Sequence, residues 1–159
     1  MKLFGDMSIE ERLEKSKHLR IVCVATPNYG HMFPMSRIAI ALQEKGHEVH
    51  VVTVDNERGR NGIPKLFDGT DVQLHMTPGM EMDIIMTDIG KDNIDPKDKF
   101  VNAWEEGCMA KIKDLKPDIV VADMLARPGF YAASALGVPA VLNMPAGPFS
   151  LYQFASLEK

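Results

Sequence analysis

The chain has 159 residues, of which 45% are hydrophobic and 25% are charged. This length and balance are typical of one globular domain with a buried core. The formal net charge is −4, so the chain lacks the basic excess that binding to nucleic-acid phosphates requires. Its two cysteines, Cys23 and Cys108, lie far apart without metal-ligand spacing, which favours a reducing compartment over a disulfide scaffold.

Residues 1–17 predict a helical extension that precedes the domain. Ser8 and Glu11 have the spacing of a capping box, and charged residues fill much of the segment. Acidic residues among the basic ones exclude a secretory signal. No window of the chain approaches the roughly 20 apolar residues of a membrane span. We therefore expect a cytoplasmic protein.

The domain begins with a predicted strand–helix–strand unit. Residues 19–26 form an apolar run rich in β-branched side chains, which is typical of a parallel strand covered on both faces. Apolar residues at helical spacing predict a helix over 32–46, with Pro34 in its first turn and Gly46 as its C-cap. Residues 47–54 predict a second strand. The two strands should be parallel, with a right-handed crossover.

The remainder continues this alternation. The predicted elements are a short helix at 63–67, a strand at 72–77, a long loop at 78–96, a helix at 96–116, a strand at 117–124, a helix at 127–137 and a strand at 138–145. Such alternation predicts an α/β fold with a Rossmann-like, doubly wound parallel sheet, for which 3-2-1-4-5 is a common strand order. Open α/β sheets of this kind bind ligands in the crevice at the C-terminal ends of the central strands.

His31 and Asp123 are the main candidates at this crevice. His31 follows the first strand and Asp123 ends the fourth, so the predicted order makes them neighbours. A carboxylate bonded to one imidazole nitrogen would fix the tautomer and leave the other nitrogen free to take a proton from a hydroxyl group. A histidine at this position of a helix can also be simply solvated. Asp118 competes as the partner, but it lies at the opposite end of its strand.

Other residues near the crevice are weaker candidates. His47 and His50 begin the second strand and are interpreted as structural, whereas His75 could line the far wall of the site. Asp55 ends the second strand, as the acidic residue of a dinucleotide site does. The first turn, however, holds the single glycine Gly30 where that site needs three, so we discount dinucleotide binding.

The chain has 11 methionines, whose soft side chains suit either the core or a pocket for a flexible apolar ligand. Those in or near the predicted crevice loops are Met32, Met35, Met80, Met82, Met86, Met124 and Met144.

Two segments have longer motifs. HLRIVCVATPNYGHMFPMSRIAIALQEKGHEVHVVT contains a strand, a G-H-x-x-P-like turn with Gly30, His31 and Pro34, and a helix that ends in GH before a second strand. KPDIVVADMLARPGFYAASALGVPAVLN has a PD motif, an aspartate at a strand end and a following helix. Together, over most of residues 18–145, they resemble the family 1 UDP-sugar-dependent glycosyltransferases.

The resemblance implies a GT-B architecture, in which two Rossmann-like domains face each other across a cleft. Residues 18–159 would be the N-terminal, acceptor-binding domain, incomplete at its C-terminus. His31 would deprotonate the acceptor hydroxyl for inverting attack on the sugar, and Asp123 would support it. The reaction would need no metal and no tightly bound cofactor, since a UDP-sugar is the donor substrate. The residues expected to contact an apolar, hydroxyl-bearing acceptor are Asn28, Tyr29, Gly30, Met32, Met124 and Met144.

The sequence departs from this family in its length, and no segment resembles the nucleotide-sugar signature. We therefore expect a domain that is inactive alone and works with a donor-domain partner chain or as a homodimer. The alternative is a non-catalytic binding module of the same fold. A hydrolase ranks last because the G-x-S-x-G motif is absent. The apolar tail at 149–157 is expected to dock on its own domain or to pair with another copy.

Overall fold

The computed structural model describes residues 8, 11, 14, 16–78 and 96–145, without the side chains of Arg58 and of residues 96–103. Most of the N-terminal extension, residues 79–95 of the predicted loop at 78–96, and the tail at 149–157 therefore lie outside the described residues. The elements are β1 (Arg20–Val24), α2 (Tyr29–Glu44), β2 (Glu48–Asp55), α3 (Glu57–Gly62), the 3-10 helix η2 (Pro64–Phe67), β3 (Gln73–Pro78), α5 (Pro96–Leu115), β4 (Ile119–Asp123), α6 (Arg127–Leu136) and β5 (Ala140–Asn143).

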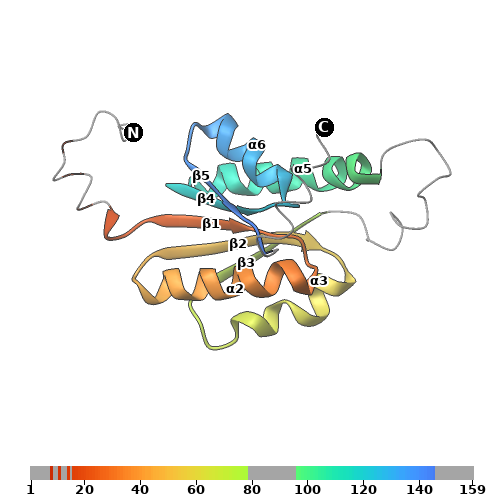
Figure 1. The fold of residues 1–159 in the computed structure, drawn as a ribbon, viewed down its shortest axis with the longest axis horizontal. Helices are drawn as coiled ribbons and strands as arrows, with labels where there is room; N and C mark the ends of the chain where they lie inside the picture. The colour runs from red at the N-terminus through yellow and green to blue at the C-terminus, as the bar shows by residue number, and fades with distance from the viewer. Residues whose placement is uncertain (1–7, 9–10, 12–13, 15, 79–95, 146–159) are drawn as a thin grey trace, which may run out of the picture.

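The five strands form one parallel sheet in the order β3-β2-β1-β4-β5. Helices α5 and α6 cover one face of this sheet, and α2 and α3 cover the other (Figure 1). The predicted α/β class and strand order are thus confirmed. Since β1 and β4 are neighbours, their carboxyl ends lie side by side between the two helical layers.

The central strands bury both of their faces. In β1, Val22 and Val24 belong to the core cluster under α5 and α6, whereas Ile21 and Cys23 belong to the cluster under α2. This explains the unbroken apolar run of the first strand. Cys23 and Cys108 are both buried free thiols, and burial raises the pKa of each to about 12. Neither is therefore a nucleophile at neutral pH.

Two predicted helix caps are present. Ser8 donates its N–H to Glu11 Oε2 at 2.7 Å, and Glu11 donates its N–H to Ser8 Oγ at 3.1 Å, which confirms the capping box. Gly46 follows α2 with a φ of +89°, and its N–H donates to the carbonyl of Gln43. Glycine adopts this left-handed conformation without a steric penalty.

Helix α2 begins at Tyr29, three residues before the predicted start at 32. The carbonyl of Asn28 accepts N–H groups from His31 at 3.0 Å and from Met32 at 2.8 Å, so the predicted turn is already the first helical turn. Pro34 consequently lies inside the helix instead of in its first turn. It lacks the N–H that would bond to the carbonyl of Gly30.

Helix α3 was not expected, because the segment Glu57–Gly62 holds turn-forming residues and two glycines. Asn56 Oδ1 caps the helix by accepting the N–H of Gly59 at 2.8 Å. A Cβ atom at Gly59 would lie 2.6 Å from the carbonyl oxygen of Val54. A glycine that looks like a helix breaker thus allows α3 to pack against the end of β2.

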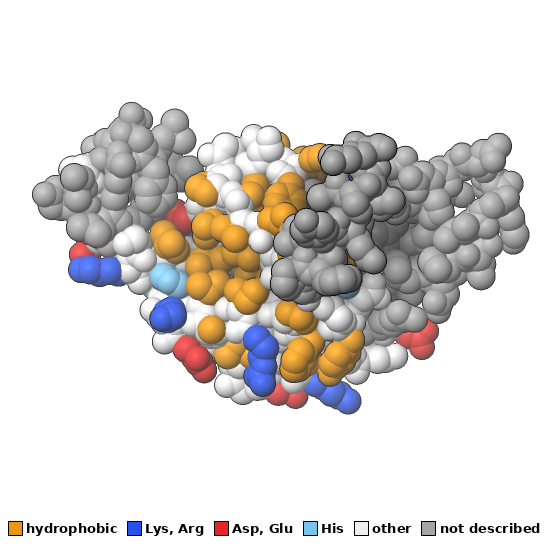
Figure 2. Space-filling model, viewed as in Figure 1, with side chains coloured by type: hydrophobic (Ala, Val, Ile, Leu, Met, Phe, Trp, Pro, Cys, Tyr) orange, Lys and Arg blue, Asp and Glu red, His pale blue; other side chains and the backbone are white. Residues whose placement is uncertain are grey.

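Strand β5 forms an apolar edge of the sheet. Val141 pairs with Val121 and Leu142 with Ala122, so their side chains point to opposite faces. Both are about half exposed, at 47% and 51%. Figure 2, in the view of Figure 1, shows hydrophobic side chains gathered on the surface where β5 crosses the sheet. Within the described ranges, no helix is long and apolar enough to cross a membrane.

Candidate functional site

The sheet brings His31 and Asp123 into direct contact. His31 is the third residue of α2, which follows β1, and Asp123 is the last residue of the neighbouring β4. His31 Nδ1 lies 2.8 Å from Asp123 Oδ1, although 92 positions separate the two residues. Their meeting follows from the strand order, because parallel neighbours end at the same edge of the sheet.

The buried carboxylate fixes the state of the imidazole. Asp123 is fully buried, and the side chain of His31 is 23% exposed. Oδ1 of Asp123 also accepts the N–H of Leu125 at 2.9 Å, which holds the carboxylate in place. Since a carboxylate accepts hydrogen bonds, Nδ1 of His31 carries the proton. In the neutral ring Nε2 then has a free lone pair, so it can accept a proton from a hydroxyl group.

A cavity of about 400 Å³ opens beside the N-terminus of α2. Its lining residues are Pro27, Asn28, Tyr29, Asn61, Gly62 and Ile63. His31, two residues beyond Tyr29 on α2, is not among them. The volume is within the range of pockets for small organic ligands.

The part of the cavity wall formed by residues 61–63 was missed by the sequence analysis. This segment ends α3 and leads into η2, and α3 was predicted as a loop. A signal was nevertheless present: the segment belongs to the connection that follows β2, whose carboxyl end lies at the same edge of the sheet as that of β1. Topology alone could therefore have placed it near the site.

The predicted acceptor residues on α2 have different environments. Asn28 and Tyr29 line the cavity, and Tyr29 is 63% exposed and stacks on Phe33 with 6.0 Å between ring centroids. A Cβ atom at Gly30 would meet nothing within 4 Å, so packing does not require glycine there. Met32 is fully buried in the core cluster under α2, where it reaches no ligand-accessible surface.

The two other methionines predicted to contact an acceptor follow strands β4 and β5. Met124 and Met144 are both half-buried, and both lie at the edge of the sheet that holds Asp123. The N–H of Met124 donates to the carbonyl of Asn143 at 3.0 Å, which ties the two strand ends together. Met80, Met82 and Met86 lie outside the described residues.

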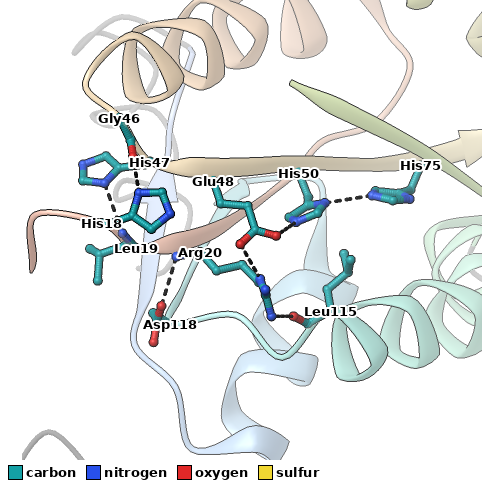
Figure 3. Close-up of polar contacts among 10 residues, drawn as sticks. All are labelled: His18, Leu19, Arg20, Gly46, His47, Glu48, His50, His75, Leu115 and Asp118. Atoms are coloured by element: carbon teal, nitrogen blue, oxygen red, sulfur yellow. Dashed lines mark hydrogen bonds and ion pairs between the residues drawn. The ribbon is translucent and has the colours of Figure 1, made fainter. Parts of the chain in front are cut away.

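His50 and His75 belong to a separate network, drawn in Figure 3. His50 Nδ1 lies 3.0 Å from His75 Nε2, and His50 Nε2 lies 3.0 Å from Glu48 Oε1. The second carboxylate oxygen of Glu48 pairs with Arg20 Nε at 2.9 Å. Asp118 accepts the N–H of Arg20 at 2.9 Å, away from the carboxyl end of β4. This network joins β1, β2 and β3 on the side of the sheet that α5 covers.

His75 does not line the far wall of the candidate site, so that prediction is wrong. Strand β3 extends to Pro78, which places His75 in its middle. His75 is in register with Val52, which belongs to the core cluster under α5 and α6. Its side chain thus lies on the opposite face of the sheet from α2.

We expect acid to destabilise the protein through His75. Burial, followed by the charges of His50 and Lys111, holds the pKa of His75 below its usual range, whereas Asp114 acts in the opposite direction. The unfolded chain therefore takes up this proton first, and stability is lost as the pH falls through the usual value of 6.5.

The melting temperature should accordingly fall between pH 7.5 and 5.5, and less steeply in His75→Gln. The matched control His47→Gln removes a histidine outside the His50–His75 pair and should retain the steep profile. Equal slopes for wild type and His75→Gln would contradict this account.

No protein-family model matches the chain, and no curated protein matches it. Solved structures do match. The glycosyltransferase SsfS6 from a Streptomyces species has a TM-score of 0.65 and 22% identity, over 80% of this chain and 39% of its own. SnogD from Streptomyces nogalater has a TM-score of 0.64 and 21% identity, over 81% and 33%. UGT2 from Phytolacca americana has a TM-score of 0.68 and 16% identity, over 87% and 34%.

The chain has the fold of one part of GT-B glycosyltransferases. At these identities the likeness concerns the fold alone, and it agrees with the predicted single Rossmann-like domain with strand order 3-2-1-4-5. The chain spans between about a third and two fifths of the length of these three structures. In the part of the chain that the structure describes, no three His, Cys, Asp or Glu side chains form a group that could hold a metal ion.

Proposed function

We propose that this chain binds the acceptor in a sugar-nucleotide-dependent glycosyl transfer and that His31 is the general base. The observation that supports this most strongly is the 2.8 Å contact between His31 Nδ1 and the fully buried Asp123. A buried carboxylate that orients an imidazole in this way is typical of sites that activate a hydroxyl nucleophile. The fold that the chain shares with glycosyltransferase structures is a second support for this proposal.

In the proposed reaction, Nε2 of His31 takes the proton of an acceptor hydroxyl as its oxygen attacks the anomeric carbon of the sugar. The new carbon–oxygen bond forms as the bond to the nucleoside diphosphate breaks, and the diphosphate leaves with the electron pair. Attack from the opposite side inverts the anomeric carbon. Asp123 stabilises the imidazolium that forms, and its burial strengthens this interaction because no water screens it.

The donor in this proposal is a nucleoside diphosphate sugar. One SsfS6 structure is complexed with thymidine diphosphate, and the Phytolacca UGT2 structure is complexed with UDP-2-fluoro-glucose and pterostilbene. Since this chain spans only about a third of such structures, we place the main donor contacts on residues outside it.

The acceptor in this proposal is a small, mostly apolar molecule with a free hydroxyl group. Tyr29 offers an exposed aromatic face at the cavity, and Ile63 and Pro27 add apolar lining. Aromatic side chains bind flat aromatic ligands through offset stacking. Pterostilbene, a stilbene with one free phenolic hydroxyl, is a suitable probe.

Calorimetric titration tests this assignment. Pterostilbene should bind the purified chain, and Tyr29→Ala should weaken that binding, whereas Tyr131→Ala on α6 should not. UDP and UDP-glucose should give no heat of binding with the chain alone. The acceptor site would be contradicted if pterostilbene does not bind, or if Tyr29→Ala does not weaken its binding. Tight binding of UDP-glucose would contradict the placement of the donor site outside this chain.

Binding without catalysis is the second candidate, and it is favoured by the absence of His31 from the residues that line the cavity. The cavity would be the same, but His31 would have no role toward the hydroxyl group. Pterostilbene and its O-methyl ether, which lacks the hydroxyl proton, would then bind equally well.

A further inference from the structure

One oxygen of the catalytic candidate Asp123 has no hydrogen-bond partner within the described part of the chain. Oδ1 accepts hydrogen bonds from both His31 and Leu125, whereas Oδ2 is buried and has none among the described residues. A buried carboxylate oxygen without a hydrogen bond costs about 1–3 kcal/mol or more. Such an atom in a native structure calls for a specific explanation.

A buried hydrogen-bond donor of complementary chemistry lies on the neighbouring strand β5. The amide nitrogen Nδ2 of Asn143 is also buried and also lacks a hydrogen-bond partner in the described part of the chain. Oδ2 of Asp123 can only accept, and Nδ2 of Asn143 can only donate. The two groups are thus a matched acceptor and donor.

Strand register places these groups next to each other. Asp123 and Asn143 are paired across β4 and β5, at the carboxyl ends of both strands. Paired residues of adjacent strands point to the same face, and the strands are about 4.8 Å apart. Val121, two residues before Asp123, packs in the cluster under α2. Since alternate residues of a strand share a face, the side chains of Asp123 and Asn143 both lie on the face of the sheet that α2 covers.

We propose that Asn143 is a positioning residue for the His31–Asp123 pair, with its Nδ2 group donating to Oδ2 of Asp123 directly or through one water. This inference rests on the proposed function for its catalytic meaning. A turn of the Asn143 carboxamide about its Cβ–Cγ bond, or a single water, closes the contact. The residues that line the acceptor cavity take no part in this contact between Asn143 and Asp123.

The contact would act on the orientation of the carboxylate. With bonds on one oxygen only, Asp123 can rotate about its own Cβ–Cγ bond and release His31. A donor at Oδ2 anchors the second oxygen and keeps Oδ1 aimed at Nδ1 of His31. The ring then stays in the Nδ1–H tautomer, with Nε2 free to accept a proton.

Nitrogen-15 NMR of the ring of His31 tests this role in the chain as it exists. In wild type the shifts should report the Nδ1–H tautomer, and the Nδ1 proton should exchange slowly. Asn143→Leu, similar in size but without a donor, should give a tautomer mixture and at least tenfold faster exchange. Asn143→Ser keeps a donor and should restore much of the wild-type signal. Gln73→Leu, an exposed amide on the far strand β3, serves as the matched control.

Two results would overturn the proposal. One is a folded Asn143→Leu protein with the tautomer and exchange rate of wild type. The other is an Asn143→Ser protein that behaves like Asn143→Leu, since the side chain would then act through its shape alone. Because this measurement needs no acceptor, donor or turnover, it is independent of pterostilbene binding, which tests the proposed function separately.

Discussion

Replacing Trp104 with alanine is expected to lower the free energy of unfolding by about 3–5 kcal/mol. Trp104 is fully buried between α5 and the sheet, in the same core cluster as Val52 and Ile112. Its Nε1–H donates to Thr77 Oγ1 at 2.9 Å, and that hydroxyl donates to the carbonyl of Thr53 at 3.2 Å. Truncation would leave a large cavity and remove the donor to a buried hydroxyl.

Urea denaturation followed by circular dichroism measures this effect, because Trp104 is the only tryptophan and its fluorescence disappears with the mutation. Trp104→Phe keeps an aromatic ring but loses the N–H group, so it should cost clearly less than alanine. Tyr131→Ala, at a 41% exposed aromatic on α6, should change stability by less than about 1 kcal/mol. A loss below about 1 kcal/mol in Trp104→Ala would contradict the described packing of α5.

Replacing His31 with alanine is expected to remove the preference of the site for a free hydroxyl group. Wild type should bind pterostilbene about tenfold more tightly than its O-methyl ether, because a hydrogen bond to a carboxylate-oriented imidazole contributes about 1.4 kcal/mol. In His31→Ala the two affinities should be equal. Where donor-binding residues are supplied, the same mutation should slow sugar transfer by about 10²–10⁴-fold.

Paired titrations of the two ligands measure this difference directly. His47→Ala, at a histidine in contact with the start of β1, is the matched control and should keep the wild-type preference. Equal affinities in wild type would show that His31 does not contact the hydroxyl group and would favour the binding-module alternative. A preference that persists in His31→Ala would place the hydroxyl elsewhere.

The topology was predictable because apolar patterning and chain order constrain a parallel sheet strongly. The run at 19–26 could only be buried on both faces, and each of its neighbours had to be reached by a crossover. The same rule brought His31 and Asp123 to one edge. Their 2.8 Å contact could not be derived, because it depends on where α2 begins and how Leu125 holds the carboxylate.

Features that depend on close tertiary packing escaped sequence reasoning. Helix α3 forms although its sequence resembles a turn, because Gly59 fits against Val54 and is capped by Asn56. The 61–63 wall of the cavity was missed for the same reason. The pairing of His50 with His75 depends on the register of β2 and β3, which sequence patterns do not encode. Asn143 could not be connected with the site from the sequence, because the connection depends on its register with Asp123.

The central claim is that His31 receives the proton of an acceptor hydroxyl, and the nitrogen-15 spectrum of its ring tests this most directly. In the free protein Nε2 should resonate as an unprotonated nitrogen. Addition of pterostilbene should shift that resonance as the nitrogen accepts a hydrogen bond, whereas the O-methyl ether should leave it in place. A protonated Nε2 in the free protein, or a bound pterostilbene that leaves Nε2 unshifted, would contradict the claim.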